Sequence, residues 1–187
     1  MLIYLPTKIN IRKARKALQQ GEVIIYPTDT LYGLGADIFN KEAVKKVFRI
    51  KGREFKAPLS VMVSSLKEIK DLAWVNKEQE KLMSALLPGP FTFILKKKAK
   101  VSKILTGGKK TIGVRIPDSR ICQQLSKNFP ITTTSANVSG FEPSLSIKKI
   151  TKEFSQQVNL ALKGEGLTGR PSIIVDLTEK PFKFFRF

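Results

Sequence analysis

Apolar and polar residues change their period along the chain, and these changes mark its predicted elements. Residues 22–26 form an apolar, β-branched run that is typical of a buried strand, and Pro27 ends it by removing a backbone donor. A polar turn with two glycines follows at residues 28–35. The next segment begins at the helix cap Asn40, repeats apolar residues on one face and stops at Gly52. This stretch predicts a strand, a turn open to a polar ligand, and an amphipathic helix.

The same periodicities extend over the whole chain. They predict helices at residues 10–20, from 65, at 76–87, 118–127 and 146–154, and strands at 59–63, 91–95, 111–116, 131–134, 158–162, 172–177 and 183–187. Strands and helices alternate, but several connections resemble hairpins. The prediction is therefore a mixed α/β (α+β) fold with one twisted, mostly open mixed sheet and flanking helices. We expect a single domain over residues 1–187.

The composition excludes several classes of protein and of catalytic site. A chain of 187 residues can bury a core, and no apolar run approaches the ~20 residues of a membrane span. The N-terminal segment lacks the features of a signal peptide, so we expect a cytoplasmic protein without membrane association. The chain has no histidine and one cysteine, Cys122, which excludes Ser-His and Cys-His triads and most zinc sites. Catalysis must then depend on hydroxyls, amides, carboxylates and cations.

The chain is strongly basic, with a formal net charge of +19 from 34 basic and 15 acidic residues. Such an excess favours polyanions through counterion release. However, only eight of the basic residues are arginine, and the lysines are scattered, with the densest groups at 96–98 and 109–110. Scattered lysines are more typical of a solvated surface than of a specific binding face. We therefore expect weak, non-specific binding to nucleic acid.

Three cations lie where a polar ligand would explain them. Lys51 and Arg53 flank the predicted helix stop at Gly52, beside the polar turn, and this suits an anion site. Arg115 lies inside an apolar strand, where a charge is costly unless it meets an anion. A structural explanation stays open for Lys51, because a cation at a helix C-terminus also stabilises the helix dipole.

Five motifs in the chain resemble, in their order, those of one enzyme family. They are YPTDTLYGLG at 26–35, KGR at 51–53, LPGPFTFIL at 87–95, TIGVRIP at 111–117 and TSANVSG at 134–140. Together they are similar to the motifs of YrdC-type threonylcarbamoyl-AMP synthases, and the resemblance extends from about Glu22 to the end of the chain. It implies the same mixed α/β architecture.

The resemblance also implies a reaction and its substrates. L-Threonine, bicarbonate and ATP give L-threonylcarbamoyladenylate and pyrophosphate, and a downstream tRNA threonylcarbamoyl transferase machinery uses this product to modify tRNA next to the anticodon. The threonine amine adds to bicarbonate or its CO2 equivalent, and the carbamate oxygen then attacks the α-phosphorus. This chemistry needs cations and oriented hydroxyls but no covalent nucleophile. Mg²⁺ is expected with ATP, but its ligands are open, with Asp29 and Asp37 candidates by proximity alone.

Individual site residues follow from the matched motifs. The resemblance assigns L-threonine binding to Thr30, Arg115, Thr133 and Ser172. It assigns ATP binding to Lys51, Arg53, Thr111, Ser135, Asn137, Ser144 and Arg186, and gives Lys51 and Arg53 a catalytic role as well. Thr30 and Ser135 would otherwise be ordinary turn residues that bond their own backbone.

Three features depart from the family pattern. One is the segment RPSIIVD at 170–176, which lacks the glutamate that often precedes its serine. Met62 stands where some members have a histidine, and Ala57 where an acidic residue or asparagine is common, which puts the affinity for the amino acid in question. In the last predicted strand, alternation places Phe185 and Phe187 on one face. Their burial would hold Arg186 in place.

Two alternative functions stay open. A basic RNA-binding module without catalysis fits the charge, but aromatic residues are dense only in FKFFRF at 182–187, where their alternation suits a strand. A carbamoyl-transfer domain of hydrogenase maturation shares the fold that the resemblance implies, although further zinc-binding and acylphosphatase-like domains would then be expected. The oligomeric state does not follow from these patterns, and a monomer is the simplest expectation.

Overall fold

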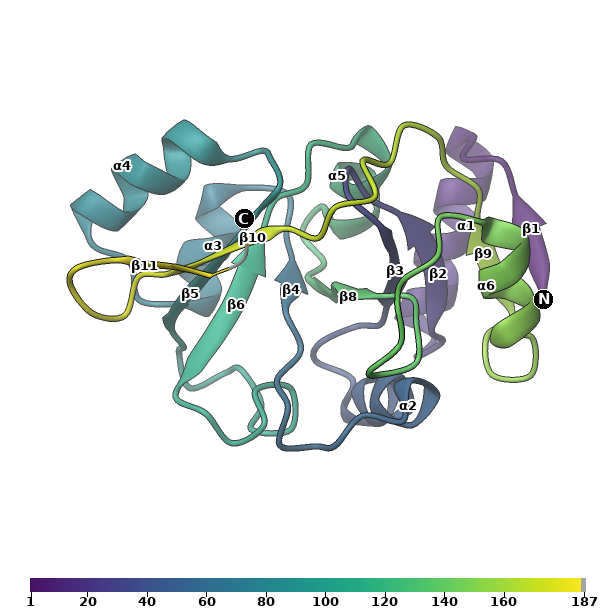
Figure 1. Cartoon of the computed structure of the whole chain (residues 1–187), viewed down its shortest axis with the longest axis horizontal. Coiled ribbons are helices and arrows are strands. Elements are labelled where there is room, and N and C mark those ends of the chain that lie inside the picture. Colours follow the sequence, from purple (N-terminus) through teal and green to yellow (C-terminus); the bar gives the residue numbers. More distant parts are fainter. Residues whose placement is uncertain (186–187) are drawn as a thin grey trace.

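The strands are divided between two mixed sheets. The structure, a computed structural model, describes residues 1–185. Within that range, the first sheet has the order β1 (Leu2–Tyr4), β9 (Leu160–Leu162), β2 (Ile24–Pro27), β3 (Tyr32–Gly35) and β8 (Thr134–Ser135). The second has the order β11 (Lys183–Phe185), β10 (Ile173–Asp176), β5 (Phe91–Lys96), β6 (Thr111–Arg115), β4 (Val61–Met62) and β7 (Ile131–Thr132). Figure 1 shows the two sheets side by side.

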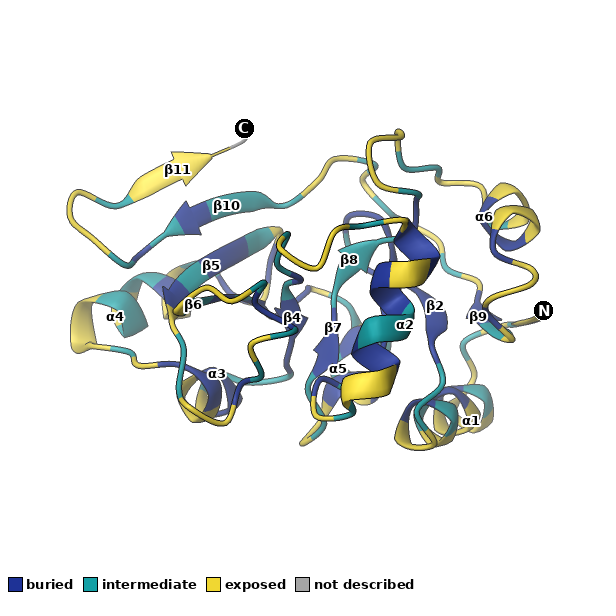
Figure 2. Cartoon of the chain, turned by 90° about the horizontal axis from the view of Figure 1, so that it is seen from below, coloured by how far each residue is buried: buried dark blue, intermediate teal, exposed yellow. Residues whose placement is uncertain are grey.

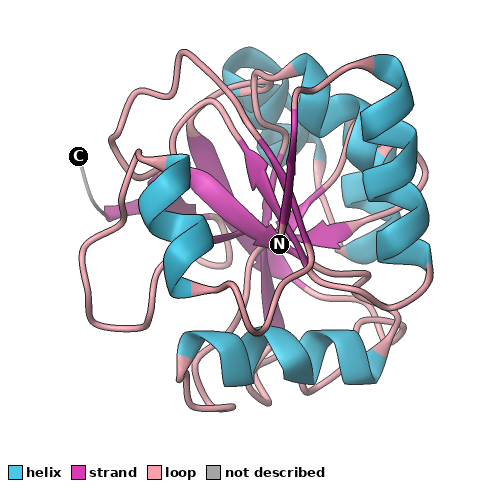
Figure 3. Ribbon diagram, turned by 90° about the vertical axis from the view of Figure 1, so that its right-hand side faces the viewer, coloured by secondary structure: helices cyan, strands magenta, loops and turns pink. Residues whose placement is uncertain are grey.

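Helices surround these strands, as Figure 3 shows. They are α1 (Lys8–Gln19), α2 (Lys41–Lys51), α3 (Leu66–Leu72), α4 (Lys77–Leu86), α5 (Arg120–Ser126) and α6 (Ile147–Glu153). Each begins at a residue whose side-chain oxygen accepts a backbone amide, namely Thr7, Asn40, Ser65, Asn76, Ser119 and Ser146. Such caps satisfy amides that have no partner within the helix. The predicted α/β class with flanking helices is confirmed. The prediction of one sheet is wrong, because the strands that the structure describes form two.

Strand β3 replaces much of the predicted polar turn, which shortens to residues 28–31. Its sequence, YGLG, lacks a β-branched run, so its period does not predict a strand. The glycines serve packing instead: a Cβ at Gly33 would lie 3.0 Å from the Tyr26 ring, and one at Gly35 would lie 2.8 Å from it. The absence of a Cβ therefore lets the Tyr26 ring lie against β3. Strand β1 is likewise absent from the sequence prediction.

The chain crosses from one sheet to the other at Thr133. The sequence predicts one strand at 131–134, but β7 belongs to the second sheet and β8 to the first. The Thr133 amide donates to the Ser60 carbonyl at 2.8 Å, and the Thr132 amide donates to the Ala36 carbonyl at 2.8 Å. Thr132 thus bonds to the residue after β3 of the first sheet, and Thr133 bonds to the residue before β4 of the second. These bonds connect the two sheets at this point.

The prediction that Phe185 is buried is wrong. Among the residues that the structure describes, strand β11 pairs only with β10, and Phe185 is 48% exposed. Figure 2 shows this edge strand in the colour of exposed residues. An edge strand with exposed aromatic residues is held by its backbone bonds rather than by burial. Arg186 and Phe187 lie outside the described residues.

The core lies between the sheets and the helices that cover them. Helix α2 buries Val44, Val47 and Phe48 in the larger apolar cluster, and Figure 2 shows its alternating buried and exposed faces. A second cluster joins α1 and α5 around Tyr26 and Met62. Both clusters fix the strands that border the cavity described below. In the described part of the chain, no helix is both long and apolar enough to cross a membrane.

Candidate functional site

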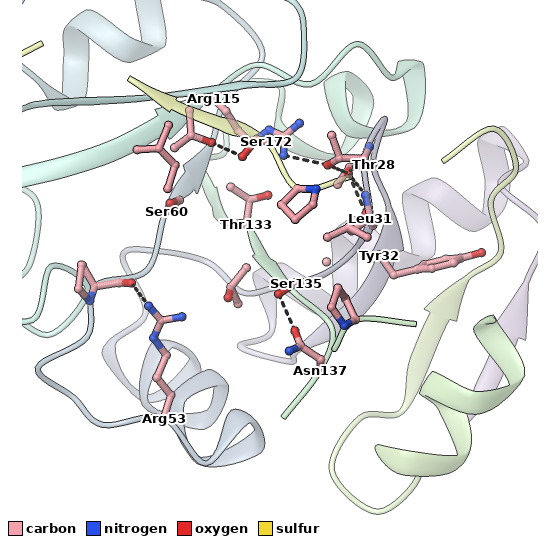
Figure 4. Close-up of a pocket in the computed structure, with 18 of the residues that line it drawn as sticks. Thr28, Leu31, Tyr32, Arg53, Ser60, Arg115, Thr133, Ser135, Asn137 and Ser172 are labelled. Carbon is pink, nitrogen blue, oxygen red and sulfur yellow. Dashed lines mark hydrogen bonds between the residues drawn. The ribbon is translucent and has the colours of Figure 1, made fainter. Parts of the chain in front are cut away.

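A cavity of about 380 Å³ opens between residues of the two sheets. Seven predicted site residues line it: Thr30, Arg53, Arg115, Thr133, Ser135, Asn137 and Ser172. Figure 4 shows Arg53 and Arg115 at opposite sides of this group. The lining is rich in hydroxyls and carries two guanidinium groups, which is the chemistry that binds carboxylates and phosphates.

The turn at 28–31 is built by Thr28. Its Oγ1 accepts the amides of Thr30 and Leu31, each at 3.1 Å, and lies 2.8 Å from the Leu31 carbonyl oxygen, to which it donates. The Oγ1 atoms of Thr28 and Thr30 are 2.9 Å apart. Thr28 thus satisfies the turn's own backbone, and this orients the Thr30 hydroxyl at the cavity.

Arg115 comes to the cavity from the end of β6 and is buried. Its Nη1 donates to Thr30 Oγ1 at 3.1 Å, and its Nη2 donates to Asp29 Oδ1 at 2.5 Å. Asp29 Oδ2 also accepts the Asp118 amide at 3.2 Å. Asp29 therefore supplies the anion that a buried arginine needs. Arg115 Nε is buried and has no hydrogen-bond partner within residues 1–185.

Arg53 comes from the opposite side, just after α2. Its Nη2 donates to the Pro58 carbonyl at 2.9 Å, and its buried Nε has no partner in the described part of the chain. Burial lowers the pKa of Arg53 below its ordinary value. In contrast to Arg115, no acidic residue forms an ion pair with Arg53 within residues 1–185. An incoming anion would therefore stabilise this guanidinium.

Lys51 does not line the cavity. It is 2% exposed, and its Nζ donates to the carbonyl oxygens of Ser135 at 2.5 Å and Asn137 at 2.7 Å. It therefore lies behind the chain segment that carries these two residues. Burial, followed by the neighbouring Arg53 charge, lowers the pKa of Lys51 to about 8.

Several lining residues were missed by the sequence prediction. Thr92 Oγ1 lies 2.9 Å from Ser172 Oγ, and Thr28, Ser60 and Phe141 also line the cavity. Thr28 and Thr92 each lie within a motif quoted above, so the signal was the motif itself. Ser60 and Phe141 lie outside the quoted motifs, and only the packing of segments that are distant in the sequence brings them to the cavity.

Besides Lys51, two predicted residues of the described chain, Thr111 and Ser144, are not part of this lining. Thr111 pairs with Lys96, whereas Arg115, at the other end of β6, pairs with Met62. Ser144 Oγ accepts the Ser146 amide at 3.1 Å and so belongs to the turn before α6. Arg186 lies outside the described residues. The assigned roles of Thr111, Ser144 and Arg186 stay predictions.

The candidate metal ligands do not form a cluster. Within residues 1–185, no group of three or more histidine, cysteine, aspartate or glutamate side chains is arranged to hold a metal ion. Asp29 is engaged by Arg115, and Asp37 Oδ1 accepts the Phe39 amide at 2.9 Å. Neither carboxylate belongs to a ready site for Mg²⁺.

The Cys122 thiol and the Tyr26 phenol are buried groups that do not line the cavity. Burial raises the pKa of Cys122 to about 12 and that of Tyr26 further above its ordinary value of 10.0. The Tyr26 hydroxyl donates to the Thr132 carbonyl at 3.0 Å, and Cys122 Sγ to the Pro27 carbonyl at 3.3 Å. Both are neutral packing groups, and Cys122 is therefore an inert thiol.

Comparisons with known proteins relate the whole chain to named relatives. A relative from Methanocaldococcus jannaschii, provisionally named threonylcarbamoyl-AMP synthase, is 42% identical over 166 residues, which cover 88% of this chain and 79% of the relative. Threonylcarbamoyl-AMP synthase of Vibrio vulnificus is 33% identical, with 89% and 93% covered. The structure of Pyrococcus abyssi Sua5 complexed with L-threonine has a TM-score of 0.94 and 32% identity, and the match covers 100% of this chain and 57% of that longer protein.

A family model extends the agreement over most of the chain. The model for Sua5, YciO and YrdC proteins, described as telomere recombination, matches residues 16–187. The matched range includes all the motifs and every residue that lines the cavity. The chain belongs to the Sua5/YciO/YrdC family.

Proposed function

We propose that the protein is a threonylcarbamoyl-AMP synthase. It would convert L-threonine, bicarbonate and ATP into L-threonylcarbamoyladenylate and pyrophosphate. The observation that carries this proposal is the cavity itself, in which two separate guanidinium groups approach from different elements and hydroxyls lie among them. Relatives that are named for this activity support the synthase over an RNA-binding module or a hydrogenase-maturation domain.

The side of the cavity around Arg115 would bind L-threonine. Thr30 and Arg115 already contact one another, and the Arg115 Nε has no partner in the described chain. A substrate carboxylate at this guanidinium would gain charge-assisted bonds. Ser172 and Thr133 would then orient the amine and side-chain hydroxyl from the neighbouring wall. The complex of P. abyssi Sua5 with L-threonine supports L-threonine as a substrate.

The side around Arg53 would bind ATP. Arg53 has no acidic partner within residues 1–185, and Ser135 and Asn137 line the wall next to it. Thr111, Ser144 and Arg186 keep their assigned nucleotide roles as proposals. Lys51 lies behind the cavity wall, and no direct contact with the nucleotide is proposed for it. No carboxylate cluster is available in the described chain, so the residues present do not fit a Mg²⁺ site that the protein builds by itself.

The chemistry would follow from positioning and charge. Once the threonine amine has added to CO2 with loss of a proton, or to bicarbonate with loss of water, a carbamate oxygen attacks the α-phosphorus. Pyrophosphate then leaves with the electrons of the broken P–O bond. Arg115 would hold one reactant and Arg53 would stabilise the charge that develops on the phosphoryl oxygens. No side chain needs to form a covalent intermediate, and a chain without histidine can therefore perform this reaction.

The cellular context follows as part of the same proposal. The product would supply the threonylcarbamoyl group to a downstream tRNA transferase machinery, since a mixed carbamic–phosphoric anhydride is an activated acyl donor. The chain would act as one domain, as a cytoplasmic monomer, and would bind tRNA weakly and without sequence preference.

A pyrophosphate assay tests the proposed function. The protein is incubated with ATP, L-threonine and bicarbonate, pyrophosphate is followed in time, and the adenylate product is identified by mass spectrometry. Pyrophosphate is expected only when L-threonine and bicarbonate are both present. Release that does not depend on L-threonine would identify a plain ATP pyrophosphatase and reject the synthase. Omission of each substrate in turn provides the matched controls.

A further inference from the structure

Lys51 contacts the cavity wall from behind, through the segment at residues 135–141, called here the 135–141 loop. We propose that Lys51 is a positioning residue whose ammonium group holds the 135–141 loop in the shape that forms the nucleotide side of the cavity. The nucleotide side is part of the function proposed above, whereas the hold on the loop is independent of any ligand.

The ammonium group uses its donors on the loop. Lys51 Nζ donates to the Ser135 carbonyl at 2.5 Å, to the Asn137 carbonyl at 2.7 Å and to Asn137 Oδ1 at 3.3 Å. A protonated lysine has three N–H groups, and these three acceptors match them. Lys51 is also only 2% exposed. No donor is therefore left for a phosphate in the cavity.

The hold extends through Asn137 to the far end of the loop. Asn137 Oδ1 also accepts the Ser135 hydroxyl at 2.5 Å, and its Nδ2 donates to the Phe141 carbonyl at 2.6 Å. The Ser139 amide donates to the Lys51 carbonyl at 2.8 Å. One residue at the end of α2 thus contacts the loop through its side chain and its main chain. Ser135, Asn137 and Phe141 in turn line the cavity.

Because Lys51 is buried, its ammonium group must keep its hydrogen bonds to the 135–141 loop. Lys51 belongs to no ion pair within residues 1–185, so neutral oxygens of the loop stabilise its charge there. A buried ammonium is costly unless it is hydrogen-bonded, and buried carbonyls are costly when they lose their donor. The loop and the lysine therefore stabilise one another in a single geometry.

A direct phosphate contact would have a different geometry. It would place at least one N–H of Lys51 in the cavity, as Arg53 places its guanidinium there. The two roles respond differently to Lys51→Arg. Arginine binds phosphate well, so a direct contact would survive. The planar, forked guanidinium does not reproduce three bonds to a point-like ammonium, so a hold on the loop would not.

Hydrogen–deuterium exchange without ligand tests the hold on the loop. Wild type, Lys51→Met and Lys51→Arg are compared, with Arg49→Met as the matched control, because Arg49 is an exposed cation in the last turn of the same helix. Peptides over residues 135–141 are expected to exchange faster in both Lys51 variants and at the wild-type rate in Arg49→Met. Unchanged exchange in Lys51→Met would overturn the proposal, whether or not the protein is a synthase.

Ligand binding tests the consequence for the cavity. Affinity for α,β-methylene-ATP is expected to fall about tenfold or more in both Lys51 variants, and that for L-threonine by less than about twofold. Retained affinity for the analogue in Lys51→Arg would show a direct phosphate contact and overturn the proposal. Failure of the analogue to bind wild type would reject the synthase instead, and the exchange result would still decide the role of Lys51.

A measurement on wild type covers the case in which the variants do not fold. The ammonium of Lys51, observed by ¹⁵N NMR, is expected to be protected from solvent exchange and to keep its chemical shift when α,β-methylene-ATP is added. A shift of this signal on binding, or rapid solvent exchange before binding, would overturn the proposal.

Discussion

Single residues differ in how their charge is stabilised at this site. Arg115 has an acidic partner, Asp29, at 2.5 Å, whereas Arg53 has a carbonyl and a buried Nε without a partner in the described chain. Lys51 is surrounded by oxygens of the 135–141 loop. Arg53 is therefore the cation whose environment changes most when an anion enters, and Lys51 the one that changes least.

Replacement of Arg53 by alanine is expected to lower synthase activity roughly ten- to hundredfold, because a charge-assisted bond to phosphate contributes ~1.5–3 kcal/mol. Folding should change by no more than about 1.5 kcal/mol, since one bond to the Pro58 carbonyl is lost. Steady-state kinetics and thermal melting measure the two effects, with Arg49→Ala as the exposed control. A lower melting temperature with intact specific activity would instead assign Arg53 a structural role.

The pKa of Lys51 makes stability depend on pH. Its value in the folded protein, about 8, lies below the ordinary 10.5, so between these values the unfolded chain binds more protons than the folded one. The free energy of unfolding is then expected to rise by about 1 kcal/mol from about pH 7.5 to about pH 9. The raised pKa of Cys122 acts in the opposite direction as the pH approaches and passes its ordinary 9.0, so it offsets part of this rise.

Urea unfolding at the two pH values measures this rise. The Lys51→Met protein provides the control, because it keeps every other titrating group and lacks the ammonium. An equal rise in the variant would contradict the assignment of this pH dependence to Lys51.

At the scale of elements, the cavity depends on the loop between β9 and β10, which packs on the turn at 28–31. The Thr168 amide donates to the Asp29 carbonyl at 3.1 Å, and the Gly169 amide donates to the Thr30 carbonyl at 2.9 Å. The start of the same loop is held by Tyr32, whose hydroxyl donates to the Gly164 carbonyl at 3.1 Å and accepts the Gly164 amide at 3.0 Å. Strand β3 and this loop therefore hold the turn from two sides.

Substitution of Tyr32 by phenylalanine is expected to destabilise the protein by about 1–3 kcal/mol, since it removes both bonds to Gly164 and leaves partly buried backbone groups unpaired. L-Threonine affinity should fall as well, because the loop also contacts Thr30. Chemical unfolding and calorimetric titration test the two effects. Tyr4→Phe is the control, since the Tyr4 hydroxyl makes none of the side-chain bonds described above. Equal stability of the two variants would contradict this role of Tyr32.

For the whole molecule, the two sheets place the cavity and the net charge sets the long-range field. Thr133 lies where the chain crosses between sheets, and Arg115 and Ser135 reach the cavity from strands of different sheets. The net charge of +19 is spread over many lysines in the sequence and attracts polyanions without a specific pattern.

Binding to tRNA is therefore expected to be weak and to vanish near physiological salt. The logarithm of the association constant should fall against that of salt with a slope of about −0.7 to −0.9 per phosphate neutralised. Filter binding or fluorescence anisotropy over a salt series measures this slope, with an unrelated RNA duplex as the comparison. Nanomolar affinity that persists at physiological salt would contradict the prediction and favour an RNA-binding module.

The sequence by itself determined the features that depend on near neighbours. Helix α2 follows from the spacing of Val44, Val47 and Phe48 and from its cap at Asn40, because side chains three or four residues apart share a helix face. The absence of histidine excludes whole classes of mechanism without any structure. The order of motifs identified the residues around most of the cavity, since each motif carries its own short segment of the site.

Only the tertiary structure decided which of these segments meet and which way their side chains face. Lys51 and Ser135 are separated by 84 positions, and Thr92 and Ser172 by 80, so no local pattern relates them. Strand β3 can form because Gly33 and Gly35 lack a Cβ and so leave room for the ring of Tyr26, which lies on the paired strand β2. The sequence of β3 by itself resembles a turn. Burial against distant partners, and not local propensity, therefore directed Arg53 to the cavity and Lys51 to the loop behind it.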